Sequence, residues 1–368
     1  MKGKTRGYLC PILVFALLLP LAVPGLLPSD VSRTDPDMED QIIEFRANPA
    51  SEELLNHYWE MKIKDFGDLL ALLYPSWPPT SLFKYCDYLV AHDTGLMDGR
   101  YSIMAKDYLE NEVLLPLAKI AGFEAESVSD LRKLNLAAKR ELAEVFYIWS
   151  RDGAAFADMA FDKIAIALVV TAPGMLFLVL SLMLPFDIFD TIFRYFTTTN
   201  MNVMDMIPIP FLIKSPVETA HYGNSHCMGK ALLLASLLEM IGLKVGLGFI
   251  GAQVIYTRAP QIANLIPKAI QYIPAIGHTF VMLKDPGWGI GRWVVAPGEE
   301  IVFEMNGITY GSLPEKDMVG RAIEGNYLLL EPTYSELFNP LFPPLGFDEN
   351  FPDWLGLNPN ELAFGLLN

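Results

Sequence analysis

Charged residues are scarce in this chain, and basic ones are the scarcer kind. Only 19% of the 368 residues are charged and 52% are hydrophobic, whereas soluble domains carry about a quarter charged residues. Such a deficit requires membrane-embedded segments, an unusually apolar core, or both. The 27 Lys and Arg residues are outnumbered by 43 Asp and Glu residues and form no basic run. A chain of this charge repels a phosphate backbone, which argues against nucleic acid as a partner.

Cysteine is rare as well, with only Cys10, Cys86 and Cys227 in the chain. Cys10 falls in an N-terminal apolar segment, so a soluble portion would hold two cysteines and at most one disulfide, which excludes a disulfide scaffold. There is no CxxC, no HExxH and no Cys/His cluster with zinc spacing, so the sequence predicts no metal site and no cofactor. A lone cysteine in a suitable setting is then a candidate nucleophile.

Two apolar segments predict a membrane location. Three basic residues precede an uncharged stretch, and segment 1–28 is therefore typical of a signal peptide or signal anchor. The run 164–186 has 23 uncharged residues. As a helix it would reach roughly 34 Å, enough for a hydrocarbon core of about 30 Å. Pro173 in the middle of this run leaves a buried hairpin as the alternative, so we expect one or two membrane spans. The sequence does not decide on which side of the membrane the C-terminal half lies.

From 38 to 160 the sequence predicts an all-α domain. Apolar residues recur at three- and four-residue spacing, and Ser127 with Asp130 three residues later is a weak form of the capping box that opens a helix. His92 and Asp93 match an acid–base pair by residue type. Neighbours on one element usually point apart, however, so we predict an ordinary surface turn there.

The segment 205–340 has a different pattern. Cys227 opens an almost continuously apolar stretch that ends at Gly242 and is too short to cross a membrane, which predicts a helix buried on nearly all sides. The first turn of a helix has free N–H groups and the positive end of the helix dipole, and both favour the thiolate that a cysteine nucleophile needs. Taken alone, Cys227 fits a small core residue better, because free cysteine is commonly buried.

Two further residues favour chemistry. His278 begins a strand-like run and is placed to act as a general base. Glu331 ends the run NYLLLE, where a carboxylate can accept the other imidazole N–H and fix its tautomer. A cysteine on a helix, a histidine on a strand and an acid on the next paired strand form a specific combination.

The stretch from about Pro216 to Tyr334 resembles the transglutaminase-like superfamily of papain-fold thiol enzymes. The resemblance rests on PVETAHYGNSHCMGKALLLASLLEMIGLKV, GHTFVML and YLLLEPT, which lie within about a third of the chain. It implies an α+β domain with a central buried helix packed on an antiparallel sheet. It also implies that Cys227 is the nucleophile, His278 the general base and acid, and Glu331 the residue at a position where the family more often has Asp.

This chain departs from the family pattern at several positions near the cysteine. Ser225 stands where glycine is usual, His226 directly precedes the cysteine, and Gly229 replaces a common acidic residue. Insertions at 258–274 and 285–325 also lengthen the intervals between the three residues. Lys230, one turn along the helix, is expected to be a solvated edge or substrate rim.

The sequence therefore predicts a membrane-associated thiol enzyme that hydrolyses amide or peptide bonds, or transfers acyl groups, with a protein or peptide as its substrate. A helical domain precedes the α+β papain-like domain, and a Pro/aromatic tail, 341–368, follows it. One alternative is a non-catalytic scaffold or binding protein that kept the fold. A transporter or channel component is a weaker alternative, because neither candidate span has a charge inside its apolar run. The oligomeric state is left open.

Overall fold

The computed structural model describes residues 36–64, 80–153, 213–223, 225, 227–251, 277–290, 293–296, 300–305, 308–314, 325–332, 346–348 and 362–366. The apolar segments 1–28 and 164–186 lie outside these residues, and so do His226 and the insertion 258–274. Among the described helices, none combines the length and the apolar character that crossing a membrane requires.

Regular structure described between residues 36 and 153 is helical, as the spacing of apolar residues predicts. The helices are α2 (Pro36–Glu44), α3 (Glu52–Lys64), α5 (Thr80–Asp93), α6 (Arg100–Tyr108), α7 (Leu115–Ile120), α8 (Val128–Arg132) and α9 (Leu136–Asp152), with a π-helical stretch, η2 (Leu109–Leu114), between α6 and α7. Ser127 does precede α8, but its hydroxyl donates to the Asp130 carboxylate at 3.0 Å and caps no backbone N–H. The capping box expected there is therefore wrong.

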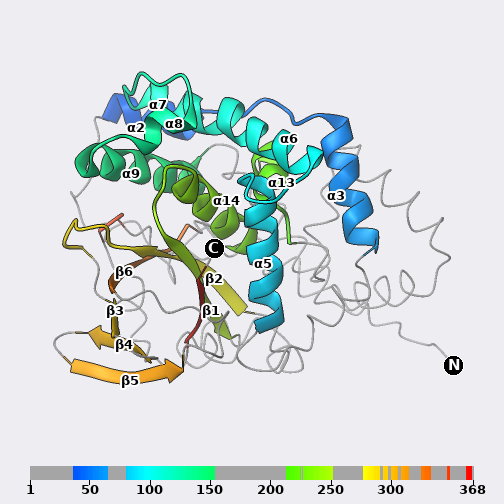
Figure 1. Cartoon of the computed structure of the whole chain (residues 1–368). Coiled ribbons are helices and arrows are strands. Elements are labelled where there is room, and N and C mark those ends of the chain that lie inside the picture. The colour runs from blue at the N-terminus through cyan, green and yellow to red at the C-terminus, as the bar shows by residue number, and fades with distance from the viewer. Residues whose placement is uncertain are drawn as a thin grey trace, which may run out of the picture. The chain divides into compact units, whose positions relative to one another are not determined.

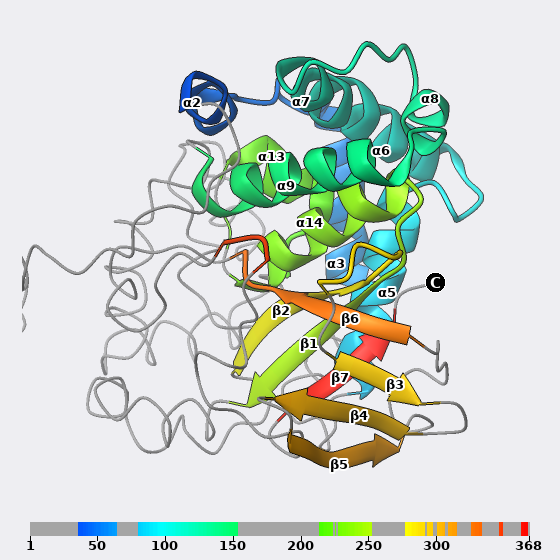
Figure 2. The same ribbon diagram turned by 90° about the vertical axis from the view of Figure 1, so that its left-hand side faces the viewer.

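Helix α14 (Cys227–Met240) is the central element, and 12 of its 14 residues are buried. It contacts α13 (Pro216–Tyr222), α5 and α9 as well as strands β1 (Val245–Gly251) and β2 (Gly277–Lys284). In Figure 2 it lies between the helices and the sheet. Gly242, with a φ of 82°, follows the helix in the left-handed conformation that terminates helices. The predicted buried helix is confirmed.

The described strands form a seven-stranded antiparallel sheet in the order β5-β4-β3-β6-β2-β1-β7. Their bounds are β1 (Val245–Gly251), β2 (Gly277–Lys284), β3 (Trp293–Ala296), β4 (Glu300–Met305), β5 (Ile308–Pro314), β6 (Gly325–Leu330) and β7 (Leu362–Leu366). In Figure 1, β3, β4 and β5 lie farther from α14 than β1 and β2 do. Strands β3, β4 and β5 come from the insertion 285–325 and add to the sheet beyond β6. The insertion therefore leaves β2 and β6 as direct neighbours.

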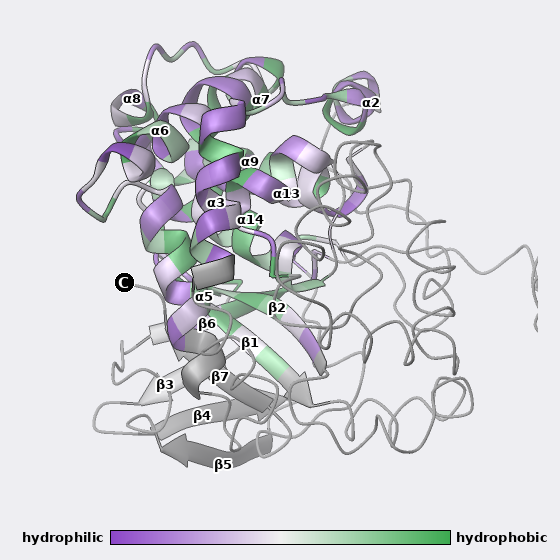
Figure 3. Ribbon diagram, turned by 90° about the vertical axis from the view of Figure 1, so that its right-hand side faces the viewer, coloured by the Kyte–Doolittle hydropathy of each residue, from purple (hydrophilic) through white to green (hydrophobic). Residues whose placement is uncertain are grey.

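The helical segment and the sheet contribute to one hydrophobic core. Its buried members include Tyr58 on α3, Phe146 on α9, Leu233 on α14 and Leu328 on β6. Figure 3 shows the mostly hydrophobic colouring of β2 beside helices that carry hydrophilic faces. Residues expected in two domains, 38–160 and 205–340, thus bury their apolar surface against each other.

Candidate functional site

The three residues predicted to carry chemistry come together at one end of the sheet. Cys227 is the first residue of α14 and is half-buried. His278 is the second residue of β2, and Glu331 directly follows β6, and both are buried. Because β2 and β6 are antiparallel neighbours, the start of β2 lies beside the end of β6. That arrangement brings the two side chains into contact across 53 positions of sequence.

His278 has partners on both sides of its ring. Its Nε2 forms a short hydrogen bond with Oε2 of Glu331, and the Cys227 thiol is hydrogen-bonded to the ring as well. Glu331, His278 and Cys227 therefore form a chain of polar contacts that ends at the N-terminus of a buried helix.

The charges of this cluster hold a proton on His278. Burial by itself would lower the pKa of the imidazole, but the Glu331 carboxylate and the Cys227 sulfur outweigh it and raise the pKa to about 10. An imidazolium beside a cysteine sulfur favours the thiolate form of the cysteine. At neutral pH the arrangement therefore supports a thiolate–imidazolium pair.

The stability of the protein should depend on this pair over a defined range of pH. The pKa of His278 is about 10 in the folded state and close to 6.5 in the unfolded chain. Its contribution is therefore complete below pH 6.5 and is lost as the pH rises towards 10. In urea denaturation across this range, the unfolding free energy of the wild type should fall more steeply than that of a His278→Gln variant. Parallel pH profiles would contradict the raised pKa.

The first turn of α14 approaches its neighbours so closely that position 229 requires glycine. A Cβ at Gly229 would overlap Ser225 Oγ and lie 2.8 Å from Thr219 Oγ1. Ser225 and Thr219 are both buried. The serine hydroxyl therefore occupies the space that an acidic side chain at 229 would need. Two departures from the family pattern, Ser225 and Gly229, are thus spatially matched.

This match predicts coupling between the two positions. Replacing Gly229 with alanine forces Ser225 to move and should cost about 1–3 kcal/mol, the usual range for overpacking. In a Ser225→Gly background the same substitution should cost less, because the closest obstacle is gone. Thermal unfolding of the wild type, both single variants and the double variant closes this mutant cycle. Additive costs would show that the two positions do not share this space.

The helix before the cysteine is fixed by a buried ion pair that the sequence did not lead us to predict. Lys62 Nζ on α3 lies 2.6 Å from both carboxylate oxygens of Glu218 on α13, and the lysine is 1% exposed. Glu218 also accepts the Ser215 backbone N–H at 2.7 Å, while Ser215 Oγ accepts the Glu218 N–H, which completes a capping box. The sequence signalled the capping box, though not the ion pair, through the S-x-x-E pattern of 215–218.

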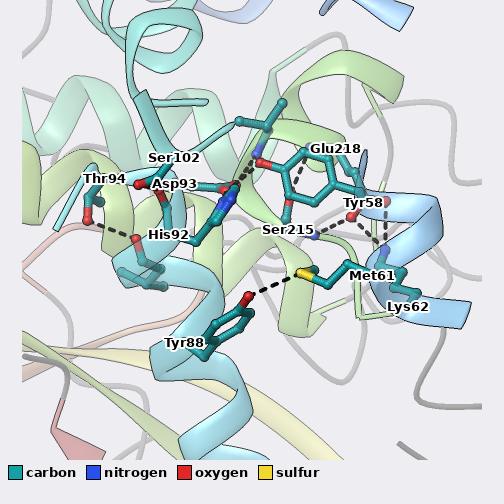
Figure 4. Close-up of polar contacts among 12 residues, drawn as sticks. Tyr58, Met61, Lys62, Tyr88, His92, Asp93, Thr94, Ser102, Ser215 and Glu218 are labelled. Carbon is teal, nitrogen blue, oxygen red and sulfur yellow. Dashed lines mark hydrogen bonds and ion pairs between the residues drawn. The ribbon is translucent and has the colours of Figure 1, made fainter. Parts of the chain in front are cut away.

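The expectation of a surface turn at His92 and Asp93 is wrong. Both residues are buried, and their side chains bond to each other, with Nδ1 2.7 Å from Oδ1 (Figure 4). Asp93 also accepts the Tyr58 hydroxyl and, at 3.0 Å, the backbone N–H of Val217 at the start of α13. The α5 C-terminus therefore supports α13 from a second side. The two side chains can meet because Asp93 is the last residue of α5. At a helix end, adjacent side chains need not point apart as they do in the helix interior.

The expectation of a solvated Lys230 is wrong as well. The residue is fully buried, and its Nζ donates to the backbone carbonyl of Arg151 at 3.2 Å. That carbonyl is at the C-terminus of α9, where the helix dipole and unpaired carbonyls favour a cation. Lys230 therefore connects α14 to α9 and is no part of a solvated rim.

Within the described part of the chain, no cluster of His, Cys, Asp and Glu residues is suited to hold a metal ion. Comparison of the chain with family models, characterised proteins and solved structures found no match. The inference of a function therefore rests on the residues and their geometry.

Proposed function

We propose that this chain is a membrane-associated thiol enzyme of the transglutaminase-like type, which cleaves or transfers acyl groups at amide bonds of a protein or peptide. The observation that carries the proposal is the chain of contacts from Glu331 through His278 to Cys227. It ends at the N-terminus of a buried helix, where a thiolate is favoured. No metal or cofactor is needed for this chemistry.

The reaction would proceed in two acyl-transfer steps. The Cys227 thiolate attacks the amide carbonyl, and the carbonyl electrons move to oxygen, where the backbone N–H of Cys227 stabilises the charge. The intermediate collapses as the His278 imidazolium gives its proton to the departing amine, which leaves a thioester. Water or an amine then attacks the thioester, His278 accepts the proton of this nucleophile, and the thiolate is released. Glu331 keeps the imidazole oriented throughout.

Capture of the acyl-enzyme tests the proposal directly. The solubilised full-length protein would be incubated with casein and a fluorescent primary amine, and with p-nitrophenyl acetate as an activated acyl donor. We expect an acetyl group on the Cys227 peptide in mass spectra that hydroxylamine removes. Peptide release from casein would indicate hydrolysis, and labelled casein would indicate transfer.

Two cysteine variants separate the proposal from its main alternative. Cys227→Ser should abolish the acyl adduct and both activities, whereas Cys86→Ser should not, because Cys86 is buried in α5. A folded protein that forms no adduct at Cys227 and leaves casein unchanged would favour a non-catalytic scaffold that keeps the same architecture.

A further inference from the structure

A side chain from the helical segment reaches the acidic member of the cluster. The hydroxyl of Tyr147, on α9, donates to the backbone carbonyl oxygen of Glu331 at 3.1 Å. Tyr147 is 1% exposed, so solvent does not compete for this bond. The bond joins residues 184 positions apart. It links α9 to the end of strand β6.

Glu331 is the first residue after the described pairing of strands β2 and β6. The described pairing between β2 and β6 runs to Leu330, opposite Val281, and Glu331 is the next residue. The Tyr147 hydroxyl therefore holds the backbone of Glu331 directly after the last described ladder pair.

The Tyr147 ring itself is held from two directions. The Arg151 guanidinium lies over the ring at 5.2 Å from its centre. Phe347 packs against it in an edge-on arrangement, with ring centres 5.9 Å apart and planes inclined at 64°. A ring held between a cation and an aromatic edge has little freedom, so its hydroxyl occupies a defined position.

We infer that Tyr147 is a positioning residue that, by holding the Glu331 backbone, sets the placement of the Glu331 carboxylate against His278. This inference rests on the proposed function, since it concerns the same cluster. It follows that the helical segment completes the site and is more than an accessory to it. Loss of the hydroxyl alone should loosen the His278–Glu331 contact without removing any member of the cluster.

A pair of tyrosine variants isolates this effect from a general loss of stability. Tyr147→Phe removes only the hydroxyl. Tyr108→Phe is the matched control, because Tyr108 is also buried and its hydroxyl donates to a backbone carbonyl, that of Asn48, at 2.8 Å. Both variants lose a bond from a tyrosine hydroxyl to a backbone carbonyl, and Tyr147→Phe also loses the contact of the hydroxyl with Arg151. Neither Tyr108 nor Asn48 belongs to the cluster.

The readout is the titration of His278, followed by NMR in the full-length protein with labelled histidine and assigned with a His278→Ala variant. We expect Tyr147→Phe to lower the proton affinity of His278 by about tenfold, which is about one pKa unit. The rate of Cys227 alkylation at pH 6 should fall several-fold in the same variant. Tyr108→Phe should leave both quantities at their wild-type values.

The outcomes distinguish this inference from the proposed function. An unchanged His278 titration in Tyr147→Phe, or an equal change in Tyr108→Phe, would overturn the positioning role whatever the enzyme does. A shifted titration in a protein that forms no acyl adduct at Cys227 would support the positioning role and count against the thiol-enzyme proposal.

Discussion

Replacing His278 with alanine should return Cys227 to the behaviour of an ordinary thiol. A free thiol with a pKa of about 8.5 is roughly 0.3% ionised at pH 6. A thiolate held by an imidazolium is largely ionised there, although its lower basicity makes it a weaker nucleophile. These opposing effects leave an advantage of about tenfold for the wild type in its rate of alkylation by iodoacetamide at pH 6. The two rates should become equal near about pH 7, and towards pH 9 the variant should react faster, because its more basic thiol is then ionised as well.

The chain supplies its own reference for this measurement. Cys86 is buried in α5, and burial raises the pKa of its thiol, so Cys86 should stay unlabelled in the folded protein. Peptide mass spectra after alkylation between pH 5 and 9 would follow Cys227 separately from Cys86 and Cys10. If alkylation of Cys227 in the wild type has the pH dependence of an ordinary thiol, the basis for the proposed chemistry is removed.

Replacing Lys62 with methionine should destabilise the protein by about 3–5 kcal/mol, because the Glu218 carboxylate would remain buried without its counter-charge. Both oxygens of Glu218 lie 2.6 Å from the Lys62 ammonium, and the glutamate side chain is only 10% exposed. Methionine keeps much of the length and volume of lysine, so the loss reports mainly on charge. The measurement is the free energy of unfolding from urea denaturation at neutral pH.

A matched substitution at the surface provides the control. Lys133 pairs with Asp130 at 3.1 Å, but 71% of the lysine side chain is exposed, so Lys133→Met should leave the unfolding midpoint almost unchanged. Equal effects of the two substitutions would mean that water reaches Glu218 and that α13 is not held by a buried ion pair.

Local pattern in the sequence was sufficient for the helical segment and for the buried helix after Cys227, and it singled out three residues that the structure brings together. The apolar run after Cys227 has no polar face, so it is stable only as an interior helix, and Gly242 ends it. His278 and Glu331 were located by the strands that carry them. These inferences depend on neighbours in the chain, which the sequence displays directly.

The position of the insertion 285–325 was decided by the tertiary structure. By sequence alone it only lengthens the interval between His278 and Glu331. In the structure its described strands join the sheet beyond β6, so β2 and β6 remain neighbours. Strand order depends on pairings across long stretches of chain, and no local pattern encodes them.

The environments of individual polar residues were decided by the tertiary structure as well. Lys230 was expected at a solvated edge, and the pair His92–Asp93 in a surface turn because neighbouring side chains on one element usually point apart. All three are buried, because helices distant in sequence supply carbonyl, hydroxyl and amide partners that offset the loss of water. The contact of Tyr147 with Glu331 has the same origin. The sequence by itself determined which residues are suited to the chemistry, and only the packing of α9, α5 and α13 around α14, with α3 bonded to α13, determined what holds them in place.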